Sequence, residues 1–153
     1  MEKVQVRRAA EGDYPVIKGL AEKHNLIPNR YFTVHTPDCP KSILETEDQV
    51  IFVATRASIV IGFLNLHSEG ALKANCRTAE FEVVVDPDHR INGAGSELLN
   101  EAIQYITSSS KAETLVAKIK NGNIGSERLC EKFGFAKSRQ DSLGAFWELK
   151  IKR

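Results

Sequence analysis

One glycine-containing stretch of this sequence has residue types and a spacing that suit a chemical task. Residues 85–96 contain the pattern Arg-x-x-Gly-x-Gly, formed by Arg90, Gly93 and Gly95. The stretch follows a β-rich run and precedes an amphipathic run, so it joins a strand to the start of a helix. Glycines let backbone N–H groups approach a ligand, and a helix N-terminus adds unpaired donors and partial positive charge. The pattern predicts a cradle for a pyrophosphate, with Arg90 as a further cationic contact.

Two other phosphate-binding motifs are excluded. A dinucleotide-binding fingerprint needs a third glycine, but Gly95 is followed by Ser96-Glu97-Leu98. A P-loop needs Gly-Lys-Ser or Gly-Lys-Thr, and the sequence contains neither. Glycines before a helix also serve as plain turn residues, so the loop by itself leaves a purely structural interpretation open.

The composition is that of an ordinary globular domain. The chain has 153 residues, 42% hydrophobic and 27% charged, which is enough to bury one core. A formal net charge of +1 argues against a dedicated nucleic-acid binder. The longest apolar run, residues 59–64, is too short to span a bilayer, and the N-terminus lacks the apolar segment of a signal peptide. We expect one domain over residues 1–153, in the cytoplasm, with no nucleic-acid or membrane partner.

Cysteine and histidine usage predicts neither a disulfide framework nor a metal site. Cys39, Cys76 and Cys130 are odd in number and form no Cys-x-x-Cys pair. This favours free thiols in a reducing compartment. The four histidines form no metal-ligand pair at helical spacing, so no metal is expected.

The elements that would position the loop alternate in type. Strands are predicted at 4–9, 49–54, 58–67, 78–85, 114–119 and 144–151, with a tight turn at 55–57. Helices are predicted from an Asp13 N-cap to 24, after Gly95 with an apolar face over 98–106, and at 123–132, with a short helix near 41–46. Prolines and asparagines make the rest of 25–47 irregular. This order predicts an α/β (α+β) domain built on one mixed, mostly antiparallel sheet flanked by helices, with a parallel crossover.

Three segments spread over nearly the whole chain share a further pattern. The first, residues 6–13, reads Val-Arg-Arg-Ala-Ala-Glu-Gly-Asp. The second is the loop, Val-x-Pro-x-x-Arg-x-x-Gly-x-Gly over 85–95, and the third, 123–135, reads Asn-x-x-Ser-x-x-Leu-Cys-Glu-Lys-Phe-Gly-Phe. In order and spacing they resemble the GNAT family of N-acetyltransferases, whose motifs are IRxAxxxD, the coenzyme A loop and NxxAxxLYEKxGF. The resemblance implies a single GNAT-like domain in which the central strands splay apart.

The resemblance also implies acetyl-CoA as cosubstrate and no metal. In the family the pyrophosphate lies on backbone N–H groups of the loop, here Arg90, Ile91, Asn92, Gly93, Ala94, Gly95 and Ser96. The pantetheine arm runs beside the fourth strand, which implies main-chain contacts at Val83 and Val85. Asn123 and Ser126 match family positions near the arm and the thioester.

The implied reaction is attack of a neutral amine on the thioester carbonyl. A lysine amine, with a pKa of about 10.4, must first lose a proton. An α-amine, with a pKa of about 7.7–8.0, is largely able to react without a base, because much of it is already neutral. Glu80 and Glu82 share one face of the predicted strand and are the candidates for the base, acting through water, with Glu80 slightly preferred. They could instead face solvent, or simply attract a cationic amine. The oxyanion donor is expected to be a backbone N–H near residues 83–85.

One position departs from the family pattern. Cys130 stands where many relatives have a tyrosine proposed to protonate the leaving thiolate. A thiol with an ordinary pKa of about 8.5 could do this, but it is shorter than tyrosine. We favour the interpretation that Cys130 is a small buried residue of the helix.

The leading hypothesis is therefore an N-acetyltransferase acting on a primary amine of a small molecule, an amino acid or a protein. One alternative is a catalytically weak acyl-CoA sensor, which Cys130 favours and Glu80 and Glu82 oppose. A second is a phosphate-binding protein that does not bind coenzyme A. The acceptor depends on the loops at 25–47 and 138–144, whose shape does not follow from the sequence. The oligomeric state is open, a homodimer included.

Overall fold

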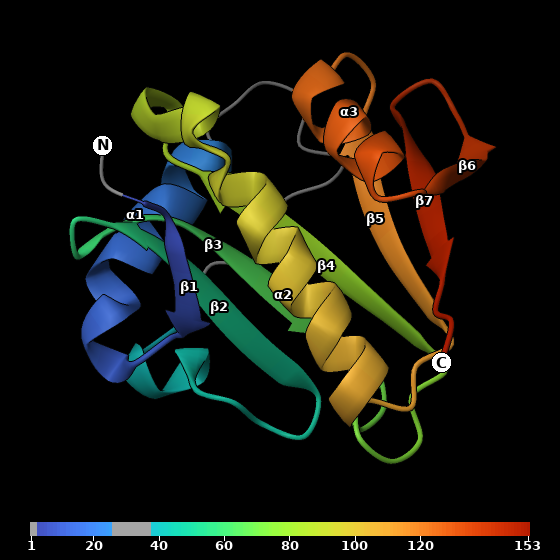
Figure 1. Cartoon of the computed structure of the whole chain (residues 1–153), viewed down its shortest axis with the longest axis horizontal. Helices are drawn as coiled ribbons and strands as arrows, with labels where there is room; N and C mark the ends of the chain where they lie inside the picture. The colour runs from blue at the N-terminus through green and yellow to red at the C-terminus, as the bar shows by residue number, and fades with distance from the viewer. Residues whose placement is uncertain (1–2, 26–37) are drawn as a thin grey trace.

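The computed structural model of the protein describes residues 3–25 and 38–153, and its centre is a seven-stranded sheet (Figure 1). The strands are β1 (Gln5–Arg8), β2 (Gln49–Arg56), β3 (Ile59–His67), β4 (Thr78–Val85), β5 (Thr114–Lys120), β6 (Ala136–Gln140) and β7 (Gly144–Lys150). They lie in the order β1-β2-β3-β4-β5-β7-β6, and every neighbouring pair is antiparallel except β4 and β5. The predicted mixed, mostly antiparallel sheet with one parallel crossover is confirmed.

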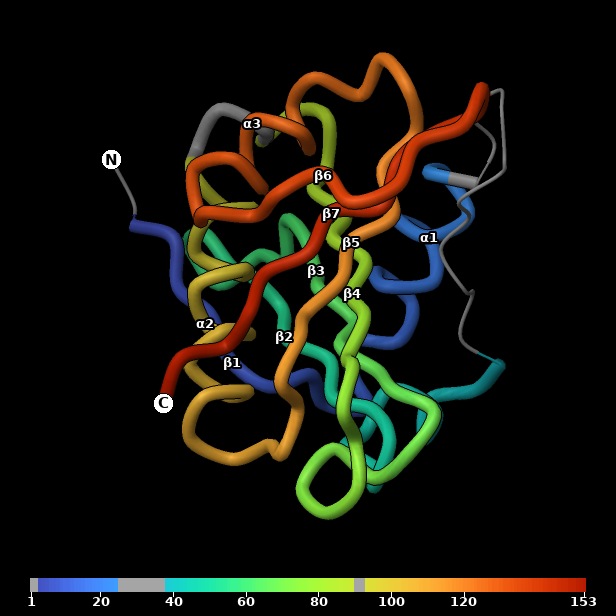
Figure 2. Tube along the Cα trace, turned by 90° about the vertical axis from the view of Figure 1, so that its right-hand side faces the viewer, coloured from blue at the N-terminus to red at the C-terminus, as the bar shows by residue number. Residues whose placement is uncertain are grey.

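The helices flank this sheet on both faces. They are α1 (Tyr14–Asn25), α2 (Ala94–Ser109) and α3 (Ile124–Lys132), with short 3-10 turns η1 (Glu11–Asp13), η2 (Pro40–Ile43) and η3 (Pro87–Asn92). Because strand side chains alternate between faces, Ala79 and Phe81 of β4 pack in the larger core with α2, while Val84 packs in a smaller core with α1. Figure 2 shows α1 and α2 on opposite sides of the sheet. The apolar face predicted for α2 is buried, with Leu98 and Ile106 at 0% exposure.

The two parallel strands pair over only part of their length. The register runs from Thr78↔Thr114 to Phe81↔Ala117 and stops there. Beyond it, β4 stays paired with β3 up to Val85, whereas β5 stays paired with β7. β4 and β5 therefore separate towards the end of the sheet that carries α3, as Figure 1 shows. The implied splay of the central strands is present in the structure.

The segment at 6–13 ties β1 to the start of α1. The Arg7 guanidinium donates two hydrogen bonds to the Asp13 carboxylate, at 2.7 and 3.0 Å. Asp13 also accepts the backbone N–H of Ala10 at 2.8 Å. The hydrogen bonds from Arg7 are the main reason that the pKa of the buried Asp13 lies below its ordinary value. Asp13 is thus not the N-cap that the sequence predicted but the last residue of η1, with its side chain directed back to Ala10.

Three further local predictions were wrong. The turn between β2 and β3 consists of Ala57 and Ser58, both with left-handed φ (51° and 66°), because β2 continues through Arg56. The short helix expected near 41–46 is the 3-10 turn η2, which begins earlier, at Pro40. Strand β6 was not predicted, and it occupies the first three residues of the expected loop at 138–144. All five residues of β6 are exposed, and no alternation of apolar and polar residues marks it. Of the irregular stretch expected at 25–47, residues 26–37 lie outside the part of the chain that the structure describes.

Candidate active site

Two adjoining cavities lie along the gap between β4 and β5. The strand cavity has a volume of about 410 Å³. The residues that line it and not the other cavity include His67, Glu80, Glu82, Lys118, Cys130 and Phe146. The loop cavity has a volume of about 640 Å³. The residues that line only this cavity include Val85, Gly93, Gly95, Ser96, Arg128 and Lys132. Both share His24, Val83, Lys120, Asn123, Ser126 and Leu129. An extended ligand can therefore run from the start of α2 to the glutamates of β4.

The floor of the loop cavity is backbone. Gly93 separates η3 from α2 with a left-handed φ of 78°, a conformation that favours glycine, and the space around its α-carbon is open. Ala94, Gly95 and Ser96 form the first turn of α2, where N–H groups have no partner inside the helix. Ala94 is itself fully buried and is not among the residues that line the loop cavity. Their arrangement is that of an anion site at a helix N-terminus.

Three of the loop positions can be placed only by their backbone. Arg90, Ile91 and Asn92 belong to η3, directly before Gly93, and their side chains lie outside what the structure describes. Three other cationic residues line the loop cavity: Lys120, Arg128 and Lys132. Lys132 Nζ donates to Ser96 Oγ at 3.1 Å and so joins α3 to the start of α2. No motif in the sequence marked these three as site residues, although Arg128 and Lys132 lie four residues apart on one helix face.

One wall of the gap is the open edge of β4. The Val84 carbonyl oxygen faces Gly62 of β3, and Asp86 N–H donates to Ile61 C=O at 2.8 Å. Successive residues of a strand direct their N–H and C=O groups to opposite sides. Val83 and Val85 therefore direct theirs into the gap, where β5 no longer pairs with β4. The two residues expected to make main-chain contacts with a ligand are those whose polar groups face the gap.

The other wall contains the start of α3. Asn123 is the N-cap of this helix, and its side-chain oxygen accepts Ser126 N–H at 3.2 Å. Both residues line both cavities, and their contact with a ligand stays a prediction.

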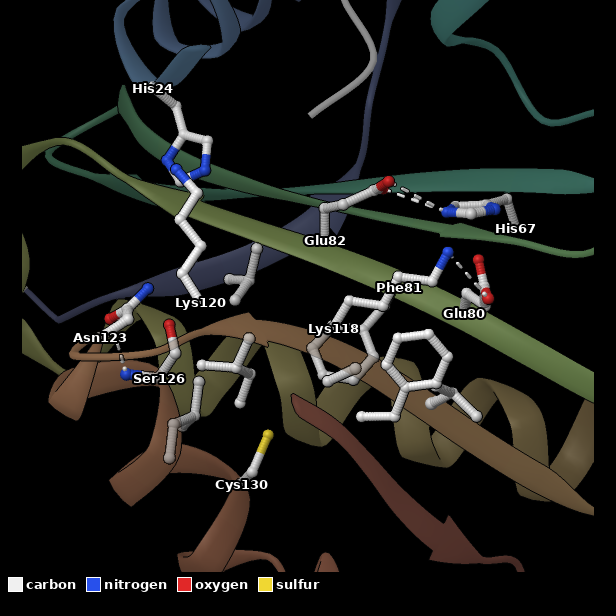
Figure 3. Close-up of a pocket in the computed structure, with 16 residues that line it drawn as sticks. His24, His67, Glu80, Phe81, Glu82, Lys118, Lys120, Asn123, Ser126 and Cys130 are labelled. Atoms are coloured by element: carbon white, nitrogen blue, oxygen red, sulfur yellow. Dashed lines mark hydrogen bonds and ion pairs between the residues drawn. The ribbon is translucent and has the colours of Figure 1, made fainter. Parts of the chain in front are cut away.

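Glu80 and Glu82 do share one face of β4, and each has a basic partner (Figure 3). Lys118 Nζ lies 3.5 Å from Glu80 Oε1, and His67 Nε2 lies 3.2 Å from Glu82 Oε1. Both contacts are diagonal across the sheet, because Glu80 is paired in register with Val116 and with His67 itself. Glu82 Oε2 is buried and lies 3.2 Å from the same His67 nitrogen, an ion-pair contact rather than an assigned hydrogen bond. The strand cavity thus holds two carboxylates, each paired with a basic side chain.

The pKa of His67 is shifted by these carboxylates. Its burial disfavours the imidazolium and is the largest single influence. The hydrogen bond and charge of Glu82, together with the charge of Glu80, outweigh it, so the pKa of His67 lies above its ordinary value. Nothing in the sequence pointed to His67, because the contact joins residues 15 positions apart on different strands.

Cys130 lies on the α3 side of the strand cavity and is almost completely buried, at 2% exposure. Burial raises the pKa of its thiol to about 12. The thiol is therefore protonated, and a weak acid, throughout the neutral range.

The part of the chain that the structure describes contains neither a candidate metal site nor a candidate membrane span. No group of three or more His, Cys, Asp and Glu side chains could hold a metal ion there. Nor does any helix among these residues have the length and hydropathy needed to cross a membrane.

The sequence and the fold both match known proteins. The model of the acetyltransferase (GNAT) family matches residues 19–135, which is more than half of the chain. The chain therefore belongs to the GNAT acetyltransferase family. No curated protein sequence matches it.

Solved structures share the fold over nearly the whole chain. An N-acetyltransferase from Staphylococcus aureus Mu50 is 26% identical, with a TM-score of 0.79 over 98% of this chain and 99% of that one. A GNAT superfamily phosphinothricin acetyltransferase from Sinorhizobium meliloti, in complex with acetyl-CoA, is 18% identical, with a TM-score of 0.79 over 97% and 89%. A ribosomal-protein-alanine N-acetyltransferase from Brucella melitensis is 21% identical, with a TM-score of 0.77 over 96% and 99%. Since these names differ in the acceptor, the shared fold does not fix it.

Proposed function

We propose that this protein is an acetyl-CoA-dependent N-acetyltransferase that acetylates a primary amine. The observation that carries the proposal is the gap between β4 and β5. One of its walls is an unpaired strand edge that leads from the start of α2 to two glutamates. This gap joins a site for an anionic carrier to a site for proton transfer.

Coenzyme A suits the loop cavity in charge and in backbone geometry. The pyrophosphate would accept N–H groups of the first turn of α2 and of the preceding η3 backbone, Arg90 to Asn92, with Arg128 and Lys132 close by. The amides of the pantetheine arm would pair with Val83 and Val85 as an added strand. The acetyl-CoA complex of the Sinorhizobium meliloti neighbour supports this assignment.

The chemistry would take place in the strand cavity. The amine nitrogen attacks the thioester carbonyl carbon, the C–S bond breaks, and coenzyme A leaves as a thiolate. The proton that the amine loses passes to a carboxylate of β4, and the thiolate is finally protonated, so that no net proton is consumed. The developing oxyanion would accept an N–H from the open β4 edge at Val83 or Val85.

The base would be one of the two glutamates, acting directly or through one water. Glu80 is held by the Lys118 ammonium, whereas Glu82 is held by His67, whose Nε2 lies 3.2 Å from each of its two oxygens. Either carboxylate lies on the face of β4 that lines the cavity. Replacing each by glutamine in turn identifies the base, because the variant that loses it loses most of the rate.

Cys130 is proposed to pack rather than to transfer a proton. A thiol with a pKa of about 12 is a poor acid towards a thiolate whose own pKa is several units lower. Water in the open gap would then supply the final proton. The same observation favours the alternative function, an acyl-CoA sensor without significant turnover, because no acid of the expected kind stands at this position.

The proposed setting is the cytoplasm, as one domain over residues 1–153. Cys39, Cys76 and Cys130 are all free thiols, which is typical of a reducing compartment.

The first experiment is a thermal-shift titration with acetyl-CoA and with coenzyme A. The wild-type melting temperature should rise with ligand concentration. Gly93→Asp should abolish the rise, because the new carboxylate faces the pyrophosphate. Gly134→Asp is the matched control: Gly134 has a similar left-handed φ of 89° but lies in neither cavity, so this variant should melt lower and yet keep the ligand-induced rise.

Release of free thiol with a panel of amines then separates the two functions. Turnover with any amine supports the transferase. Tight acetyl-CoA binding without turnover supports the sensor. No thermal shift at saturating acetyl-CoA would rule out both.

A further inference from the structure

The two strands that border the gap carry opposite charges on the same face. Glu80 and Glu82 alternate along β4, while Lys118 and Lys120 alternate along β5. All four line the strand cavity. Figure 3 shows the two lysines extending from β5 on the side of the sheet where the glutamates lie. An acceptor that enters this cavity therefore meets an acidic wall and a basic wall.

The two lysines differ in the interactions that their ammonium groups make within the protein. Lys118 is exposed, lies 3.5 Å from Glu80, and also sits over the Phe146 ring at 5.6 Å. Lys120 is half-buried, and no carboxylate of the residues that the structure describes lies within ion-pair distance of it. It lines both cavities, at the point where they meet. Among the described residues, Lys120 is thus a cation that lines the cavity without a carboxylate of its own to pair with.

This arrangement discriminates between acceptors by charge. A partly desolvated ammonium gains most from an anionic partner that also accepts a hydrogen bond. A diamine or polyamine would place a second positive charge beside the two lysines, which is unfavourable. A molecule with an amine at one end and a carboxylate at the other matches both walls. A volume of about 410 Å³ lies towards the lower end of the range for small-molecule pockets.

On the basis of the proposed function, we propose that the acceptor is a small zwitterion of the amino-acid type. Its amine would lie against the glutamates of β4, beside the thioester, and its carboxylate would be bound by Lys120. Lys120 is then the residue that determines specificity for the acid. A peptide N-terminus, whose first residue has no free carboxylate, fits the basic wall less well.

The test compares matched acceptors that differ only at the carboxyl group: an amino acid, its amide and its decarboxylated amine, for instance leucine, leucinamide and isopentylamine. Such trios are made for several side chains, and kcat/KM is measured by thiol release. The acid should exceed both analogues by about 10- to 100-fold for the preferred side chain, the range typical of a lost charge-assisted hydrogen bond. Equal or better turnover of the amide would overturn the proposal and point to peptide or protein amines.

Variants of Lys120 separate acceptor binding from coenzyme A binding. Lys120→Met should raise the KM of the acid about tenfold or more and remove its advantage over the amide, with the KM of acetyl-CoA nearly unchanged. Lys120→Arg should retain the preference. Lys120→Glu should invert it in favour of the decarboxylated amine. Melting temperatures of all three variants establish that they are folded.

Lys132→Met is the matched control, because Lys132 lines only the loop cavity. It should raise the KM of acetyl-CoA and leave the ratio of acid to amide as it is. If Lys120→Met behaves in the same way, Lys120 serves coenzyme A and the inference is wrong. If no amine is turned over at all, the proposed transferase fails instead. The acid and the amide are then compared by calorimetric binding to the coenzyme A complex, and equal binding would also overturn the inference.

Discussion

The two cavities are built from different parts of the chain. The floor of the loop cavity is backbone: the first turn of α2, the left-handed Gly93 and the open edge of β4. The strand cavity presents side chains that come from α1, β3, β4, β5, β7 and α3. Backbone N–H groups can bind the same ligand in any sequence that keeps the local conformation. The chemistry of a cavity lined by side chains changes with each substitution. This difference explains how one fold can keep a common carrier and vary its acceptor.

The largest expected effect lies in the strand cavity. Glu80→Gln and Glu82→Gln each remove one carboxylate while keeping size and hydrogen-bonding capacity. The variant that has lost the base should show a kcat lower by about 10²- to 10⁴-fold. The KM of acetyl-CoA should be nearly unchanged in both, because neither residue lines the loop cavity. Steady-state kinetics of the two variants checks this. A loss below about tenfold in both would show that neither carboxylate is the base.

Gly62→Ala tests whether the β4 edge is held in place by close packing against β3. A Cβ at Gly62 would lie 2.8 Å from the Val84 carbonyl oxygen and 3.2 Å from Val85 Cα, which are backbone atoms that cannot simply rotate away. We expect a loss of about 2–3 kcal/mol in unfolding free energy and weaker acetyl-CoA binding. Denaturant unfolding and thermal-shift titration measure the two effects.

The control for Gly62→Ala is Gly19→Ala. Gly19 lies inside α1 with open space where its Cβ would be. This variant should gain about 0.5–1 kcal/mol and bind acetyl-CoA as the wild type does. Unchanged stability and binding in Gly62→Ala would mean that the backbone of β4 can shift to accommodate the new Cβ at little cost.

Asp13→Asn should affect stability without affecting either cavity. The substitution removes the charge that accepts two hydrogen bonds from Arg7, at a cost of about 1.5–2 kcal/mol. The folded-state pKa of Asp13 is lowered, so its contribution is present above the unfolded pKa and is lost as pH falls through the folded one. The stability difference between wild type and variant should therefore shrink at acidic pH. Urea unfolding between neutral and acidic pH measures it, and a constant difference would contradict the assignment.

The smallest effect is expected at Cys130. Cys130→Ala should change kcat by less than about threefold, since the thiol is not proposed to transfer a proton. With a pKa of about 12, roughly one thiol in 10⁴ is ionised at pH 8. Mass spectrometry after iodoacetamide treatment should find Cys39, which is exposed, modified and Cys130 intact. A large loss of kcat with retained acetyl-CoA binding would instead make Cys130 the acid.

Much of the fold was predictable because the signals were local. Alternation placed β4 and β5, helical spacing placed α2, and a glycine pattern marked the turn before it. Strand β6 gave no such signal: it runs Ala-Lys-Ser-Arg-Gln, and every residue is exposed at the sheet edge. It forms because β7 offers an unpaired edge, which only the assembled sheet provides.

The sequence by itself determined the glycine turn, the order of the elements and the family motifs, because backbone conformation depends on residues close in the chain. Tertiary structure decided which side chains meet. His67 reaches Glu82 only because β3 and β4 pair in a fixed register, and Lys118 reaches Glu80 only because β5 returns parallel to β4 after the α2 crossover. The charges that line the strand cavity follow from these long-range pairings, whereas the loop at 85–96 follows from a dozen consecutive residues.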